Sequence, residues 1–231
     1  MRPQSGKALA HRAAWACRQL EAFYGRPRQP GRARNPLDSL IRTVLSQNTS
    51  DVNSERAYAS LRERFPRWED VMKAPSRSIA AAIRSGGLAN QKSRRIKRIL
   101  RWVKDQFGEL SLRSLHQKTD VEIRELLAPL PGIGPKTVHV LMAFALNRDA
   151  FPVDTHVHRV TRRLGLIAAN ATAEKAHALM APLVPQGRAY SLHVNLIRLG
   201  RQLCHPRNPE CTPCPLLREC PEGRGRTTDS R

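Results

Sequence analysis

The stretch Leu-Pro-Gly-Ile-Gly-Pro-Lys-Thr, residues 130–137, decides the fold of this chain. Its two glycines, Gly132 and Gly134, allow a tight turn because glycine tolerates positive φ and leaves room for a neighbouring backbone. Pro135 suits the first position of a helix, where an N–H group would have no helical partner. The stretch therefore predicts a hairpin turn that leads into a helix.

Both flanks of this turn are predicted to be helical. Before it, residues 120–130 follow Thr119, which can form a capping box with Glu122. After it, apolar residues recur at helical spacing: Val138, Leu141, Met142 and Ala145. This predicts a helix-hairpin-helix over about residues 120–147, whose second helix can bind a phosphate at its N-terminus. A plain turn between packed helices is the alternative, but Lys136 favours a functional turn.

The composition predicts a globular and strongly basic chain. It has 231 residues, 40% of them hydrophobic, and 40 Lys and Arg against 19 Asp and Glu, which gives a formal net charge of +21. Such a charge attracts polyanions, and nucleic acid is favoured over an anionic membrane because no strong amphipathic anchor is found. His11 and Arg12 interrupt any apolar signal core, which predicts a cytoplasmic location, nucleoid-associated in a bacterium.

The predicted fold class is all-α, because no stretch alternates convincingly with the period of two that strands show. Apolar residues recur at helical spacing instead. Further helices are expected at about residues 8–24, 35–45, 52–65, 68–73, 76–84, 91–107, 153–164, 172–183 and 190–204. The longest apolar stretch, about residues 140–146, is too short to span a membrane. Residues 222–231 are expected to form a flexible tail.

The helix expected at residues 91–107 has one apolar and one basic face. On the basic face only Asp105 opposes seven cations, which are Lys92, Arg94, Arg95, Lys97, Arg98, Arg101 and Lys104. A run of charge is usually a solvated face. The nearly uniform sign favours a phosphate-facing surface here.

Four of the five cysteines fall within 17 residues with the spacing C-x6-C-x2-C-x5-C. They are Cys204, Cys211, Cys214 and Cys220. Disulfides are disfavoured in a basic chain that is not secreted, and zinc sites more often pair two short knuckles. One Cys-x-x-Cys with longer arms favours a cubane iron–sulfur cluster, with zinc as the open alternative. Cys17 is expected to be a small core residue.

Together, residues 130–137, the Val-Asp-Thr-His of residues 153–156 and the four-cysteine loop resemble endonuclease III. That enzyme is a DNA glycosylase and AP lyase of the helix-hairpin-helix glycosylase superfamily, and the resemblance covers roughly residues 35–220. It implies a six-helix domain of residues 30–148 that contains the hairpin. It also implies an iron–sulfur domain that joins residues 1–29 to 149–221. Double-stranded DNA with damaged bases or abasic sites is the implied partner, bound between the domains by a monomer.

The resemblance also implies roles for single residues. Lys136 matches the family's nucleophile, and Asp154 matches its essential carboxylate, although an N-cap for the following helix is a second job for that side chain. The four clustered cysteines match the ligands of one [4Fe-4S] cluster. Monofunctional adenine glycosylases of this family lack the lysine, so Lys136 favours lyase activity.

The expected contacts to DNA follow from the same comparison. Ser-Gln-Asn-Thr at residues 46–49 departs from the commonest family wording, Ser-Ala-Gln-Ala-Thr. Either Gln47 or Asn48 is therefore expected to fill the gap left by an extruded base, opposite Leu88 as the apolar wedge. Ordinary core filling is the alternative for Leu88. The expected DNA contacts are completed by Gly132, Gly134 and Lys92.

The expected reaction removes oxidised or ring-saturated pyrimidines and then cuts the strand. The base must first leave the stack, at a cost of a few kcal/mol. The amine of Lys136 would attack C1′ and form a Schiff base, after which the 3′ phosphate is eliminated. A monofunctional glycosylase with another base preference and a non-catalytic DNA-binding cluster protein are the alternatives.

Overall fold

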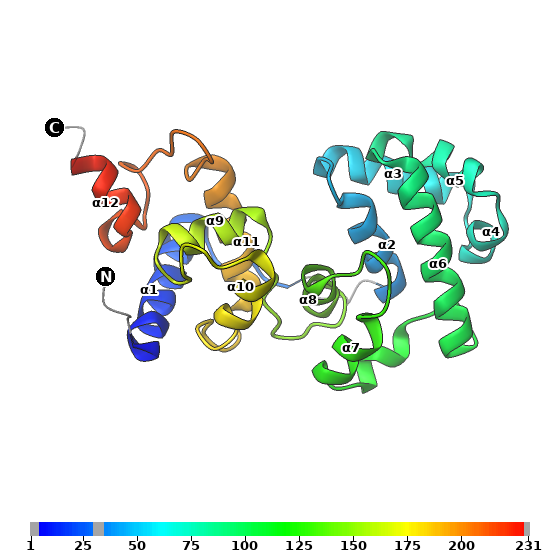
Figure 1. Ribbon diagram of the computed structural model, residues 1–231, viewed down its shortest axis with the longest axis horizontal. Coiled ribbons are helices and arrows are strands. Elements are labelled where there is room, and N and C mark those ends of the chain that lie inside the picture. The colour runs from blue at the N-terminus through cyan, green and yellow to red at the C-terminus, as the bar shows by residue number, and fades with distance from the viewer. Residues whose placement is uncertain (1–4, 30–34, 229–231) are drawn as a thin grey trace. The chain divides into compact units, whose positions relative to one another are not determined.

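The computed structural model describes residues 5–29 and 35–228, and it contains helices and no strand over these residues (Figure 1). The all-α prediction is confirmed. The chain divides into two compact units. We call residues 35–146 the hairpin unit, and residues 5–29 together with 147–228 the cysteine unit.

The hairpin unit is built around the buried helix α2. Its helices are α2 (Pro36–Ser46), α3 (Asp51–Arg64), α4 (Trp68–Lys73), α5 (Ser76–Ala82), α6 (Ala89–Phe107), α7 (Asp120–Leu127) and α8 (Pro135–Phe144). Asn35 starts α2, because its side chain accepts a hydrogen bond from the N–H of Leu37 at 3.0 Å. Helix α2 packs against α3, α6 and α8, and its apolar side chains are fully buried.

The cysteine unit joins the N-terminal helix to the C-terminal third of the chain. Its helices are α1 (Gly6–Tyr24), α9 (Thr155–Arg163), α10 (Ala173–Met180), α11 (Ala189–Gln202) and α12 (Pro221–Thr228). Helix α11 packs against both α1 and α9. The fully buried Asn195 of α11 donates a hydrogen bond to the carbonyl of Gly25 at 3.0 Å. This bond attaches the end of α1 to α11 across a long sequence separation.

The prediction of a flexible tail over residues 222–231 is wrong for the residues up to 228, which form α12. Pro221 begins the helix, and Glu222 in its first turn makes ion pairs with Arg163 and Arg226, each at 3.0 Å. The anion at the helix N-terminus and the packing of Gly223 against Leu217 stabilise the helix despite its polar composition. Residues 229–231 lie outside the described part of the chain.

Among the described residues, we find no helix whose length and hydropathy would let it cross a membrane.

Candidate functional site

The predicted hairpin is present between α7 and α8. The Thr119–Glu122 capping box starts α7, and Pro135 occupies the first turn of α8, both as expected. Gly132 has φ +82°, a value that a residue with a side chain adopts only with strain. The side chain of Ile133 is buried, which anchors the tip of the hairpin to the unit.

Lys136 is exposed in the first turn of α8. The next two residues, Thr137 and Val138, are buried, so Lys136 is the polar side chain of this turn that faces solvent, beside the exposed Pro135. The N-cap residue Gly134 has no side chain to occupy the N–H groups of the turn. A phosphate bound by these N–H groups would lie beside the amine. The hairpin can therefore present one amine to a phosphodiester chain.

Asp154 is the N-cap of α9 in the cysteine unit. Its Oδ1 accepts a hydrogen bond from the N–H of Val157 at 2.8 Å, so the capping role considered from the sequence is confirmed. The preceding residues, Phe151 and Val153, are buried. The half-buried carboxylate is therefore held at the end of an anchored segment, while Lys136 belongs to the hairpin unit.

Two buried histidines hold the segment that leads to Asp154, and the sequence analysis missed both. His177 of α10 accepts a hydrogen bond from the N–H of Val153 at 3.0 Å through Nε2. Nδ1 of His193 in α11 donates to the carbonyl of Pro152 at 2.9 Å. No local pattern marks either histidine, because each partner lies more than 20 positions away in the sequence.

The residues expected to enter the DNA duplex differ in their surroundings. Leu88 is 52% exposed and has φ +48°, so the core-filling alternative does not apply. Asn48 is also exposed and left-handed, with φ +53°. Gln47 is half-buried, and its amide is hydrogen-bonded within the hairpin unit. Non-glycine residues with positive φ are uncommon, and strained residues of this kind gather at functional sites.

The prediction that Lys92 contacts DNA is wrong, because this lysine is buried. Its side chain is 1% exposed, and Nζ donates to the carbonyls of Leu45 and Gly86, both at 2.7 Å. Desolvation, followed by the charge of Arg95, lowers the pKa of this ammonium group. Along the same face, Lys97 donates to the carbonyl of Ala74 at 2.6 Å. The exposed cations of the face are Arg94, Arg98, Arg101 and Lys104.

The four clustered cysteines line one cavity in the cysteine unit, and none of them is in a disulfide. Arg163 of α9 supports this loop. Its guanidinium donates to the carbonyls of His205 and Pro206 at 2.7 and 3.0 Å, and to the sulfur of Cys204 at 3.3 Å. Arg159, also in α9, donates from Nε to the carbonyl of Cys204 at 2.9 Å. Two arginine side chains of α9 therefore hold the loop.

The chemistry of these four thiols suits the binding of a positively charged metal group. Burial, together with the neighbouring sulfurs, raises the pKa of Cys214 to about 11, and burial also raises the pKa values of Cys211 and Cys220. A positively charged metal group would favour the thiolates, and the N–H of Gly223 already points at the sulfur of Cys220 at 3.4 Å. The donor set thus fits a thiolate-bound cluster. Across the described residues, no three His, Cys, Asp or Glu side chains are grouped around a single metal-ion position.

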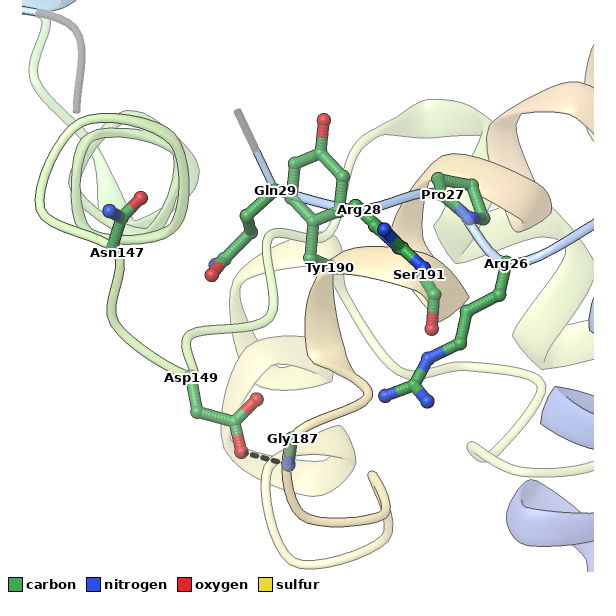
Figure 2. Close-up of a pocket in the computed structure, with 9 residues that line it drawn as sticks. All are labelled: Arg26, Pro27, Arg28, Gln29, Asn147, Asp149, Gly187, Tyr190 and Ser191. Carbon is green, nitrogen blue, oxygen red and sulfur yellow. Dashed lines mark hydrogen bonds between the residues drawn. The ribbon is translucent and has the colours of Figure 1, made fainter. Parts of the chain in front are cut away.

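A separate pocket of about 600 Å³ lies in the cysteine unit beside the start of α11 (Figure 2). Asp149 at its edge accepts hydrogen bonds from the N–H groups of Gly187 and Ala189, at 2.7 and 3.3 Å. The lining residues are Arg26, Pro27, Arg28, Gln29, Asn147, Asp149, Gly187, Tyr190 and Ser191. None of these described lining residues was predicted to act in the reaction.

Comparison with known proteins assigns this chain to a family. The model of the HhH-GPD superfamily base excision DNA repair proteins matches residues 41–186. The chain belongs to this superfamily. A putative DNA glycosylase of Arabidopsis thaliana is 37% identical over 190 residues, which are 78% of this chain and 65% of that relative. The chain thus spans about two thirds of that plant protein.

Other matches within the HhH-GPD superfamily extend over most of both partners. An endonuclease III of Thermotoga maritima is 32% identical over 186 residues, 80% of this chain and 83% of the relative. A solved non-covalent complex of endonuclease III with DNA matches with a TM-score of 0.80 at 26% identity, over 95% of this chain and 98% of the other. The resemblance to endonuclease III and the expected all-α, helix-hairpin-helix fold are confirmed.

Proposed function

We propose that this protein is a bifunctional DNA glycosylase and AP lyase that removes oxidised or ring-saturated pyrimidines from double-stranded DNA. The observation that carries the proposal is the exposed Lys136 in the first turn of α8, directly after the glycine hairpin. Membership of a base excision repair superfamily and similarity to endonuclease III support it. The formal charge of +21 supports DNA as the partner.

In this reaction the neutral amine of Lys136 attacks C1′ of the damaged nucleotide. The glycosidic C1′–N bond breaks, its electrons leave with the base, and the base takes up a proton. Loss of the amine proton and opening of the sugar ring give an iminium group at C1′. Removal of one C2′ proton then breaks the C3′–O bond and releases the 3′ phosphate, and water hydrolyses the iminium to restore the amine.

Asp154 is the second group in the proposed reaction. Its carboxylate would offset the positive charge that develops on the sugar and would accept the proton that the amine loses. The capping bond to Val157 uses Oδ1 and fixes the direction of the carboxylate. His177 and His193 support this arrangement, because they hold the backbone immediately before Asp154.

Cys204, Cys211, Cys214 and Cys220 would hold one [4Fe-4S] cluster. Such a cluster would supply a rigid anchor that shapes the basic loop for contact with phosphates. The proposal is tested by iron and sulfide analysis and by visible absorption. Cys214→Ser should lose the brown colour, and the matched variant Cys17→Ser, at a cysteine outside the loop, should keep it.

The lyase is tested by borohydride trapping on a panel of duplexes. The panel holds a ring-saturated thymine, an oxidised cytosine, uracil, and thymine opposite guanine. A covalent complex that disappears in Lys136→Ala and persists in Lys104→Ala is the expected result. Release of free base without a trapped complex would point to a monofunctional glycosylase instead. Salt-sensitive DNA binding without base release on any duplex would refute an enzymatic function.

A further inference from the structure

The side-chain amide of Gln47 connects three segments of the hairpin unit. Gln47 follows the last residue of α2, and its Nε2 donates to the carbonyl of Gly132 in the hairpin at 3.1 Å. Its Oε1 accepts a hydrogen bond from Nη1 of Arg95 on α6. One amide therefore joins the loop between α2 and α3 to the hairpin and to α6. We call Gln47, Arg95 and Gly132 the Gln47 bridge.

The contact between Arg95 and Gly132 is as close as the glycine permits. A Cβ atom built at Gly132 would overlap the guanidinium group of Arg95. The flat guanidinium thus lies directly on the hairpin backbone while it also binds Gln47. Since the bond to Gln47 is charge-assisted, it is stronger than a bond between neutral groups. The hairpin cannot shift relative to α6 without breaking this contact.

Helix α6 is also fixed to the two loops that carry Asn48 and Leu88. One turn before Arg95, the buried ammonium of Lys92 donates to the carbonyls of Leu45 and Gly86. Leu45 lies three residues before Asn48, and Gly86 lies two residues before Leu88. The exposed, left-handed Asn48 and Leu88 are therefore attached to one rigid helix.

We propose that the Gln47 bridge is a positioning device that keeps the hairpin in register with Asn48 and Leu88. Asn48 is then the polar residue available to contact the DNA, because both the nitrogen and the oxygen of the Gln47 amide are hydrogen-bonded within the hairpin unit. Gln47 and Arg95 act through the hairpin and the loops rather than on the DNA itself. This inference rests on the proposed function, in which the hairpin and the two loops meet the same damaged nucleotide.

The test compares binding to two duplexes of one sequence, one intact and one with a tetrahydrofuran abasic analogue. The ratio of the two dissociation constants measures discrimination. Gln47→Ala and Arg95→Ala should each lower this ratio by about tenfold, the loss expected for one charge-assisted hydrogen bond. The double variant should lose no more than the worse single variant, because both substitutions break the same bridge.

Two matched variants and one measurement without DNA complete the test. Arg94→Ala removes the same charge from the exposed face of α6, so it should weaken binding to both duplexes equally and leave the ratio unchanged. Hydrogen exchange of residues 130–137 in the free protein should become faster in Gln47→Ala and Arg95→Ala. It should stay at the wild-type rate in Asn48→Ala, although that variant should discriminate poorly.

The outcomes separate this inference from the proposed function. A wild-type protein that binds both duplexes equally would overturn both. If the wild type discriminates, three results would overturn the Gln47 bridge alone. They are an unchanged ratio in both folded bridge variants, losses that multiply in the double variant, and unchanged exchange of the hairpin.

Discussion

Substitution of Lys92 by methionine should destabilise the hairpin unit strongly, although it replaces a charged residue by an apolar one of similar length. The ammonium group donates hydrogen bonds to the carbonyls of Leu45 and Gly86. These carbonyls lie at the ends of two helical segments, where no following N–H group of the helix is available to them. Each buried carbonyl left without a donor costs about 1–3 kcal/mol. Removing a buried charge offsets part of this sum, so we expect a net loss of about 2–4 kcal/mol.

The assay is urea unfolding followed by circular dichroism, with the free energy of unfolding taken by linear extrapolation. The matched control is Lys104→Met, which removes an exposed lysine from the same helix and should change the free energy by less than about 0.5 kcal/mol. Equal stability of Lys92→Met and the control would refute the reasoning, because the two buried hydrogen bonds would then contribute nothing.

The pH dependence of the stability of the wild type and of Lys92→Met checks the sign of the charge effect. Desolvation lowers the pKa of Lys92 in the folded protein, whereas the unfolded chain returns it to about 10.4. Between these two pKa values the unfolded chain binds more protons, so this group makes stability rise with pH. This contribution of Lys92 to the free energy of unfolding is lost as the pH falls through the lowered pKa. The stability of the wild type relative to Lys92→Met should therefore increase through the alkaline range.

Three further substitutions, one of them paired with a matched control variant, have defined outcomes. Gly132→Ala should lower the free energy of unfolding by about 2 kcal/mol in the same urea titration, because the new methyl group adds a clash to a positive φ. The control Gly134→Ala should cost less than about 1 kcal/mol, because Gly134 has φ −93° and open space around it. Asn195→Ala should cost about 0.5–1.5 kcal/mol, seen as a lower melting temperature, because it removes the hydrogen bond from Asn195 to the carbonyl of Gly25. His177→Phe should speed amide exchange at Val153, and unchanged exchange there would contradict the contact.

The hairpin could be predicted because its signals are local. Thr119 with Glu122, the two glycines and Pro135 each act within a few residues, and the capping box and the helix start were found where expected. The spacing of apolar residues likewise predicted which face of α6 is buried, because this periodicity depends only on neighbouring turns of one helix.

Contacts between distant segments could not be predicted. Lys92 stands on the polar side of α6 in the sequence pattern, and nothing near it indicates that the carbonyl of Leu45, 47 positions away, would bury it. The same holds for α12, whose Glu222 is stabilised by Arg163 from another helix. A prediction from local sequence places such residues in solvent, because the local sequence carries no information about the distant group that contacts them.

The flat contact at the hairpin tip constrains how this sequence can drift. Any residue larger than glycine at position 132 requires the guanidinium group of Arg95 to move aside, since the two groups cannot share the space. The reverse does not hold, because a smaller residue at position 95 leaves the glycine undisturbed. A substitution at position 95 therefore leaves Gly132 as it is, whereas a substitution at position 132 displaces the guanidinium group and also carries the strain of the positive φ.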